Sequence, residues 1–243
     1  MLFRSPAPPA PWNKQTTAVF SPRGTALDAL NWYALLADAG QNALFMTFAF
    51  GINDKFKTVY RKNDTILRMA LLESDGTSAQ DKKDLQEIRN RPNVVVAIGN
   101  RIVTNSFDRW LAELSKVTGN VHVYWVHTKY MLLDPLGAAP ILVTGSANFS
   151  NASTDTNDEN MLVIRGNKRI ADIYLGEYLR LYNHYAFREA VKRYMEKHKA
   201  GTPDTWQPQY LIDDDKWMAS YFDPADTTAR NARRAYFAGP MAV

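Results

Sequence analysis

Apolar and polar positions form alternating blocks along the chain, and these blocks predict strands interleaved with helices. Short, mainly apolar runs predict strands at residues 16–20, 42–50, 65–72, 94–98 and 159–164. Apolar residues at helical spacing predict helices at residues 25–39, 54–62, 78–90, 105–117 and 168–198. Because strands and helices alternate, we expect a mixed α/β sandwich with a largely parallel central sheet flanked by helices.

This pattern covers the middle of the chain and weakens at both ends. Residues 1–15 are rich in proline and predict an extended leader. Residues 16–200 hold the predicted strands and helices, and we expect them to form one domain. Residues 201–243 mix aromatic and acidic side chains without a clear period, which predicts a loop-rich appendage packed on that domain.

Composition narrows the class of protein. At 243 residues with 46% hydrophobic content, the chain can build a sizeable core, so disorder is not expected. A net charge of +4 is compatible with an anionic substrate but falls short of the basic footprint of a nucleic-acid-binding domain. The absence of cysteine excludes disulfides and thiolate metal sites, and it leaves the compartment open. No apolar run reaches the length of a membrane span.

A histidine and a lysine stand two residues apart in a further predicted strand, residues 121–134. Side chains alternate between the two faces of a strand, so His127 and Lys129 are expected on the same face. Residues 135–140 predict a turn, and residues 141–144 predict a buried strand that returns beside the first. The return should bring the residues that follow it toward the histidine and the lysine.

Ser146 and Asn148, again two residues apart, follow this return strand. Together with His127 and Lys129 they would place an imidazole, a cation, a hydroxyl and a carboxamide in one region. A histidine surrounded by a cation and neutral donors can attack and hold a phosphate diester. The pattern therefore predicts a site for a phosphate ester.

The same residues resemble the HKD motif of the phospholipase D superfamily. The identities that carry the resemblance are His127, Lys129, Asp134, Gly145, Ser146 and Asn148. The hairpin between the two halves of the motif holds ten residues, more than the usual pattern, and loop insertions of that kind leave the strand register intact. The resemblance implies the phospholipase D-like α/β sandwich and a phosphodiesterase activity.

The resemblance also implies roles for the motif residues. His127 attacks phosphorus to form a phosphohistidine or protonates the leaving oxygen, while Lys129, Asn148 and Ser146 bind the phosphate oxygens. Asp134 would have a structural role near the hairpin, and Gly145 belongs to the structural part of the motif. Such a site needs no metal and no other cofactor, and no spacing of histidines and acids in the chain predicts a metal centre.

In the superfamily, an acid downstream of the second half of the motif accepts the other N–H of the catalytic histidine. Asp155, Asp158 and Glu159 all lie in that window. Glu159 is favoured, because it begins the next predicted strand while the other two lie in a polar loop. A carboxylate there would fix the tautomer and orientation of His127.

Other candidates are weaker. His122 lies five residues before His127 and is expected on the opposite face of the strand, in a structural role. His184 and His198 fall on the predicted long helix without evident partners. Ser146 lacks the second glycine of a nucleophile elbow, which excludes a serine hydrolase of that type.

The chain contains one HKD motif, whereas the superfamily mechanism uses two histidines across a two-fold axis. The second half comes either from a preceding region, which would make this chain the carboxy-terminal half of a two-motif enzyme, or from a homodimer mate. The unusual leader favours the first. We expect a phospholipid headgroup ester as substrate; the alternatives are a homodimeric endonuclease and a non-catalytic half that only binds phosphate.

Overall fold

A computed structural model describes residues 15–23, 29–99, 125–197, 214–223 and 225–239. The predictions that fall outside these residues are the leader before residue 15, the helix at 105–117, the strand residues 121–124, and the roles of His122 and His198. For residues 194–197, the description covers the backbone only.

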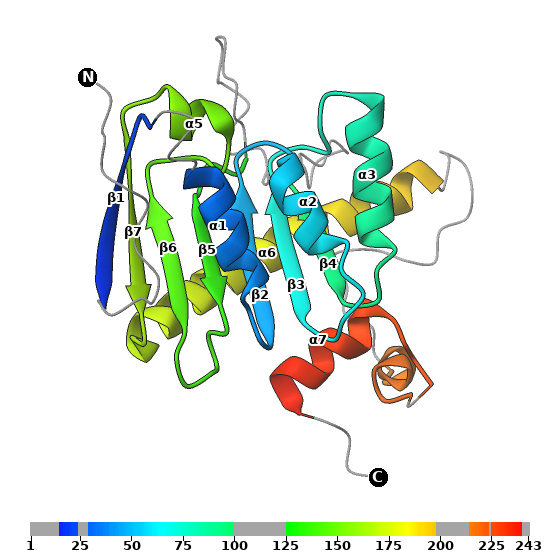
Figure 1. Ribbon diagram of the computed structural model, residues 1–243. Helices are drawn as coiled ribbons and strands as arrows, with labels where there is room; N and C mark the ends of the chain where they lie inside the picture. Colours follow the sequence, from blue (N-terminus) through cyan, green and yellow to red (C-terminus); the bar gives the residue numbers. More distant parts are fainter. Residues whose placement is uncertain (1–14, 24–28, 100–124, 198–213, 224, 240–243) are drawn as a thin grey trace.

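The described strands form one seven-stranded sheet in the order β1-β7-β6-β5-β2-β3-β4 (Figure 1). The strands are β1 (Thr16–Ser21), β2 (Ala43–Phe48), β3 (Leu67–Leu72), β4 (Val94–Ile98), β5 (Tyr130–Leu133), β6 (Ile141–Gly145) and β7 (Glu159–Arg165). For most strands, the bounds predicted from the sequence therefore agree with those of the structure to within a few residues. The exception is the strand expected at 121–134, of which the described part contains only β5.

The mixed α/β class is confirmed, but the sheet is not largely parallel. Only β2, β3 and β4 pair in parallel, whereas the other four pairings are antiparallel. The reason lies in the connections. The hairpin from β5 to β6 is too short for a crossover, and the five-residue helix between β6 and β7 spans only about 8 Å, half the length of a strand.

Helices cover both faces of the sheet. The described helices are α1 (Ala29–Asp38), α2 (Asp54–Tyr60), α3 (Ala79–Arg89), α5 (Asn151–Asp155), α6 (Lys168–Lys197), the 3₁₀ helix η2 (Lys216–Tyr221) and α7 (Ala229–Ala238). In Figure 1, α1, α2 and α3 lie in front of the sheet and the long α6 runs behind it. None of the described helices is long and apolar enough to cross a membrane.

Strand β2 contributes side chains to the cores on both faces of the sheet. All six of its residues are buried, as the continuous apolar run predicted. Leu44, Met46 and Phe48 belong to the cluster under α1, α2 and α3, while Ala43 and Phe45 belong to the cluster under α6. The two-residue alternation of a strand therefore divides one apolar run between two cores.

The carboxy-terminal segment is more regular than its sequence indicated, because α7 forms a ten-residue helix there. Ala232 and Tyr236 of α7 pack against the cluster under α6, and the rings of Tyr236 and Phe45 lie 5.8 Å apart. Neither η2 nor α7 contains a fully buried side chain. The domain boundaries at residues 15 and 200 stay a prediction.

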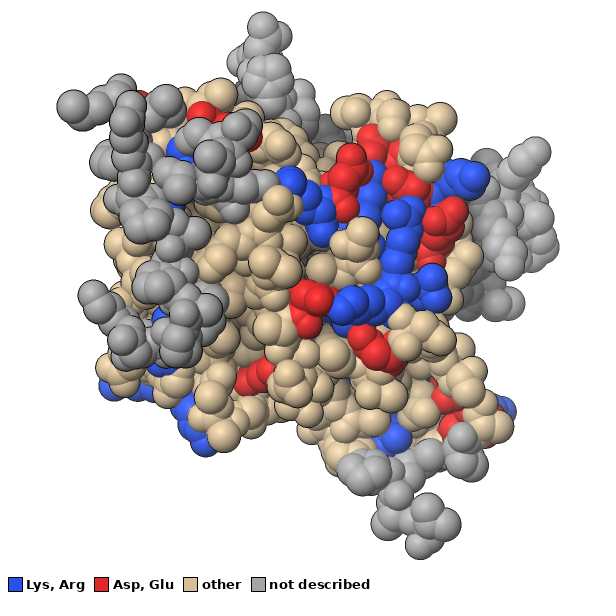
Figure 2. All heavy atoms as spheres, viewed as in Figure 1, with Lys and Arg blue, Asp and Glu red and all other residues tan. Residues whose placement is uncertain are grey.

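Charged side chains are unevenly spread on the face that Figure 2 shows. Lys, Arg, Asp and Glu gather over α2 and α3, with both signs interleaved, whereas the surface over α1 is mostly uncharged. The mixture of signs is typical of paired charges and does not form a basic stripe.

Candidate active site

His127 and Lys129 lie just before β5, at the upper end of the sheet in Figure 1. The imidazole of His127 is exposed, and Lys129 is half-buried. The ammonium of Lys129 donates a hydrogen bond to the backbone oxygen of His127 at 2.7 Å. The two residues are therefore in contact, but they belong to the segment that enters β5 and not to the strand itself.

The reason that β5 starts at Tyr130 lies in β2. Backbone pairing between the strands joins Met46 to Met131. One step further, the hydroxyl of Thr47 accepts a hydrogen bond from the backbone nitrogen of Tyr130 at 3.1 Å and donates one to the backbone oxygen of Thr128 at 2.7 Å. A side chain thus replaces the next rung of backbone hydrogen bonds, and regular pairing ends there.

Glu159 is the first residue of β7 and lies at the same end of the sheet. Burial lowers the pKa of Lys129, and the nearby Glu159 carboxylate acts in the opposite direction and raises it. The charge of Glu159 therefore acts on Lys129 from the start of the neighbouring part of the sheet. A partly desolvated lysine beside a carboxylate retains its charge and can bind a phosphate oxygen.

Gly145 allows β6 and β7 to approach closely where the site begins. A Cβ atom at this position would lie 2.1 Å from the backbone oxygen of Asn160 and 2.8 Å from the Cα atom of Met161. Both neighbours are backbone atoms that cannot move aside. Glycine is therefore required by packing between the strands.

Ser146 holds the same two strands together. Its hydroxyl accepts a hydrogen bond from the backbone nitrogen of Asn160 at 3.0 Å, and its own backbone nitrogen donates to the backbone oxygen of Asn160 at 2.9 Å. The hydroxyl therefore already serves a structural contact. Its predicted role toward phosphate stays a prediction.

Asn148 is held between two buried neighbours, Ala147 and Phe149. The ring of Phe149 packs edge-on against Phe56 at 5.5 Å between centroids, which fixes the backbone at this position. Among the described residues, the buried Oδ1 atom of Asn148 has no hydrogen-bond partner. Since a buried polar atom without a partner is unfavourable, this acceptor oxygen is available to an N–H or O–H donor of a ligand or of another side chain.

The carboxylate of Asp134 faces away from the other motif residues, at the opposite end of β5. Its two oxygens accept hydrogen bonds from the backbone nitrogens of Gln41, Asn42 and Ala43 at 2.8, 2.7 and 2.9 Å. These contacts join the hairpin to the start of β2. Asp134 also has a positive φ of 46°, a conformation that Asp adopts more readily than most residues.

A family model described as "Cardiolipin synthase, PLD-like domain" matches residues 35–181, which is more than half of the chain. The chain belongs to the phospholipase D superfamily. The matched range contains the HKD residues from His127 to Asn148 and also Glu159. No curated protein matches the chain.

Solved structures are similar only at low identity. Nuc from Salmonella typhimurium, a phospholipase D family member, is 17% identical over 69% of this chain and 93% of its own, with a TM-score of 0.48. NucT from Helicobacter pylori is 15% identical over 68% of this chain and 94% of its own, with a TM-score of 0.44. A polyphosphate kinase from Porphyromonas gingivalis is 13% identical over 75% and 30%, with a TM-score of 0.45. These values are too low to bear on activity.

Asp155 and Asp158, the other two acids in the predicted window, have surroundings that differ from those of Glu159. Asp155 accepts a hydrogen bond from the hydroxyl of Thr154 at 2.9 Å and closes the short helix α5. Asp158 is exposed. Of the three acids in this window, Glu159 is the one whose charge acts on Lys129.

His184 was expected to lack partners, and this expectation is wrong. Its Nε2 atom lies 3.1 Å from Nη1 of Arg188, and its ring packs edge-on against Tyr185. The pair is one helical turn apart on α6, a spacing that brings two side chains together. His184 therefore has a structural environment on α6.

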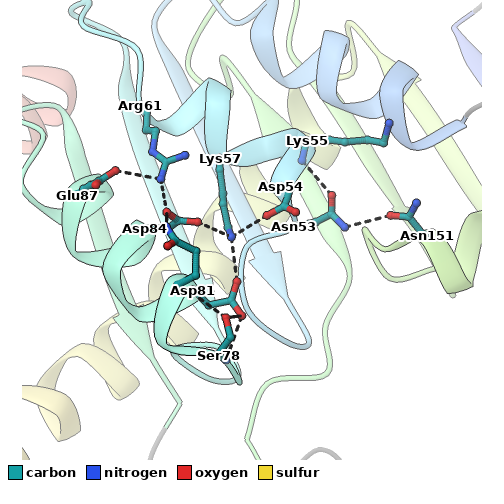
Figure 3. A network of polar contacts seen from close by, with 11 residues as sticks. Asn53, Asp54, Lys55, Lys57, Arg61, Ser78, Asp81, Asp84, Glu87 and Asn151 are labelled. Atoms are coloured by element: carbon teal, nitrogen blue, oxygen red, sulfur yellow. Dashed lines mark hydrogen bonds and ion pairs between the residues drawn. The ribbon is translucent and has the colours of Figure 1, made fainter.

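A second cluster, made of carboxylates around a lysine, lies on α2 and α3 (Figure 3). Asp54, Asp81 and Asp84 are close enough together to bind a cation. The ammonium of Lys57 already lies among them, at 2.7, 2.9 and 2.8 Å from their oxygens. We interpret the cluster as an ion network that joins α2 to α3.

Sequence reasoning missed two polar residues that hold the HKD segment, Thr47 and Glu73. Both signals were present in the sequence. Thr47 interrupts an otherwise apolar strand, and Glu73 directly follows another. A polar residue at a buried strand position needs a partner, although the pattern does not identify that partner.

Proposed function

We propose that this protein is a phosphodiesterase of the phospholipase D type, which hydrolyses a phosphodiester through a phosphohistidine intermediate. Superfamily membership supports the reaction class. The observation that carries the proposal is the placement of Lys129. Its half-buried ammonium contacts the backbone of His127 and is coupled to the Glu159 carboxylate. The presence of a cation, an imidazole and a carboxylate at one end of the sheet supports the proposal, in which Glu159 has the role of orienting His127.

The proposed reaction proceeds in two displacements at phosphorus. In the first, an imidazole nitrogen attacks phosphorus, and the bond to the leaving alcohol breaks as a second histidine donates a proton to the departing oxygen. In the second, this histidine takes a proton from water, and the water attacks the phosphohistidine to release the phosphate monoester. Lys129 and Asn148, with the hydroxyl of Ser146 as a further donor, bind the non-bridging oxygens, and no metal is required.

The second histidine comes from a partner half. In a two-motif enzyme it lies in a region that precedes this chain, and His127 then acts as the general acid. In a homodimer it is the same residue of a second copy, and His127 takes either role. Both arrangements place two HKD motifs around one phosphate.

The substrate that we propose first is a phospholipid headgroup ester. The alternative is nucleic acid, cleaved by a homodimer. A nuclease tracks the backbone of its substrate with a basic surface. The segment from the end of α5 to the start of β7, which follows the HKD residues, carries Asp155, Asp158 and Glu159 instead. These acids disfavour a long polyanion more than a single headgroup.

Hydrolysis of bis(p-nitrophenyl) phosphate in the presence of EDTA tests the proposal. We expect turnover by the wild-type protein, measured with the partner half that it needs, to survive chelation, and His127→Asn to reduce it at least about 1000-fold. His184→Asn is the matched control, because it removes a histidine of α6, and it should keep full activity. Loss of turnover on adding EDTA would contradict the mechanism.

Light scattering and two further substrates separate the alternatives. An active dimer supports the homodimer. A monomer that becomes active only with an added HKD half supports the two-motif enzyme. A protein that binds phosphate but shows no turnover, with or without the added half, supports the non-catalytic binding half. Release of headgroup from phosphatidylcholine vesicles supports the lipid substrate, whereas cleavage of single-stranded DNA at a comparable rate supports the nuclease.

A further inference from the structure

The segment that carries His127 lies outside the sheet, so its backbone cannot use the ladder of hydrogen bonds that holds β5. Residues 125–129 precede the first paired residue, Tyr130. Buried backbone donors and acceptors still need partners. In the described structure, the ammonium of Lys129 binds the backbone oxygen of His127, and the hydroxyl of Thr144 binds that of Lys129. Three further side chains, on β2, on α6 and just after β3, hold the rest of the segment, and none of these three belongs to the HKD motif.

Glu73 holds the upstream side of His127. It directly follows β3, and only 7% of its surface is exposed. Its carboxylate accepts hydrogen bonds from the backbone nitrogens of Trp125 at 3.0 Å and Val126 at 2.5 Å. A buried carboxylate that binds two consecutive amides is a strong, directional anchor. The hydroxyl of Tyr185 binds the backbone oxygen of Trp125 at 2.8 Å from the other side.

Thr47 holds the downstream side. It is 1% exposed, and its hydroxyl bridges the backbone oxygen of Thr128 and the backbone nitrogen of Tyr130. The bridge spans Lys129, so it sets the direction in which that lysine leaves the backbone. His127 thus lies between two anchors, each no more than three residues away.

We propose that Glu73 and Thr47 are positioning residues, which fix the backbone around His127 and Lys129 so that both side chains face the phosphate. This inference rests on the proposed phosphodiesterase. The imidazole of His127 is exposed, and among the described residues its ring has no hydrogen-bond partner in this half of the site. Its placement therefore depends on the backbone, and displacement of a reacting group by about 1 Å can reduce a rate about 100-fold.

Thr47 allows a clean test, because valine has nearly the same shape and serine keeps the hydroxyl. We expect Thr47→Val to lower kcat on bis(p-nitrophenyl) phosphate by about 10- to 100-fold, and Thr47→Ser to restore most of it. A purely structural role predicts that a folded Thr47→Val protein keeps the kcat of wild type, because the loss of the two hydrogen bonds would then appear only in the free energy of unfolding. If the Thr47→Val protein were as active as wild type, the proposal for Thr47 would be overturned.

Glu73→Gln places an amide N–H₂ group near the two backbone N–H groups and leaves one acceptor oxygen. We expect kcat to fall by about 10- to 100-fold while KM changes by less than about threefold, because the Lys129 side remains held by Thr47. Glu189→Gln is the matched control. Glu189 also accepts a backbone hydrogen bond, from Ile98 at 3.0 Å, but it does not hold the segment around His127.

Amide hydrogen exchange provides a readout that does not depend on activity. The Trp125 and Val126 amides should exchange at least about tenfold faster in Glu73→Gln than in wild type or Glu189→Gln. Unchanged exchange, or unchanged kcat in a folded Glu73→Gln protein, would overturn the anchor. An inactive wild type with released amides in the variant would instead count against the phosphodiesterase and leave the anchor standing.

Discussion

The Oδ1 atom of Asp134 lies 2.7 Å from the backbone nitrogen of Asn42, a residue 92 positions earlier in the chain. This contact joins the HKD hairpin to β2, the strand that also carries Thr47. The third residue of the motif therefore acts on the site through the sheet. Its carboxylate fixes the far end of β5, while the reactive groups gather at the near end.

Replacing Asp134 should destabilise the fold and leave the chemical groups of the site intact. We expect Asp134→Ala to lower the free energy of unfolding by about 2 kcal/mol, because three backbone N–H groups lose a charged acceptor. Asp134→Asn should lose less, since asparagine keeps one acceptor oxygen and tolerates the positive φ. Urea denaturation measures both. Asp158→Ala, at an exposed acid, is the control, and an equal loss there would contradict this role.

Gly145→Ala should be among the most disruptive small substitutions in the described structure. The added methyl group would lie 2.1 Å from the backbone oxygen of Asn160, so β6 and β7 would have to separate. We expect a loss of roughly 3 kcal/mol in the free energy of unfolding.

Gly176→Ala on α6 is the opposite case, since a Cβ there meets nothing within 4 Å. It should raise stability by about 0.5–1 kcal/mol, the gain of alanine over glycine inside a helix.

Thermal or urea unfolding of the two alanine variants tests both expectations at once. A Gly145→Ala protein as stable as wild type would show that the strands can move apart freely. The motif glycine would then need an explanation other than packing.

Lys57 and its carboxylates predict a pH dependence of stability. Hydrogen bonds from Lys57 lower the pKa of Asp81 and of Asp84 to about 2 in the folded protein. Burial acts to lower the pKa of Lys57, but hydrogen bonds to its three aspartates outweigh burial and raise that pKa above its ordinary value. Carboxyls with a depressed pKa stabilise the fold above their ordinary pKa. This contribution should be lost as the pH falls from about 4 to about 2.

The substitution Lys57→Met reverses the sign of this dependence. Without the ammonium, the clustered carboxylates repel one another, so the variant should be less stable than wild type at pH 7. Protonation relieves the repulsion, and the difference between the two proteins should shrink as the pH falls below 4. Urea midpoints at pH 7, 4 and 3 measure the effect. Lys55→Met, at a lysine outside the carboxylate cluster, is the control, and a constant difference across pH would contradict the network.

The sequence predicted those parts of the fold that depend on local pattern. Helix α3 illustrates this, since its Ser78 cap, its end near Asn90 and its two buried apolar residues all follow from residues within the helix. The HKD residues were identified in the same way, as a set of side chains at fixed spacing. Local periodicity and spacing were sufficient for both.

Relationships between distant residues were not predictable in this way. Thr47 fixes where a strand 83 residues later in the chain begins, because its hydroxyl replaces one pair of backbone hydrogen bonds, and no local pattern encodes that contact. The predicted parallel direction of most strands was also wrong, because the direction of a strand depends on whether the connection to its neighbour can cross over the sheet. Helix α7 was missed because its arginine-rich surface hides the few apolar residues that pack, among them Tyr236.

Glu159 provides the last prediction, which concerns the pH dependence of catalysis. Lys129 must be protonated to bind a phosphate oxygen, so activity should decline as the pH rises through its pKa. Burial lowers that pKa, and the Glu159 carboxylate raises it. Glu159→Gln removes the negative charge that raises the pKa of Lys129 and should move the basic limb of the pH–rate profile to lower pH. We also expect kcat to fall by about 100-fold, because the proposed mechanism assigns this carboxylate to the orientation of the histidine.

The pH–rate profile separates these two effects. Asp158→Asn, a neighbouring substitution that also removes one negative charge, is the control and should leave the limb in place, because Asp158 is exposed and screened by solvent. If both variants moved the limb equally, the effect would reflect total charge near the site and not the contact between Glu159 and Lys129. If kcat fell while the limb stayed fixed, Glu159 would orient the histidine without tuning the lysine.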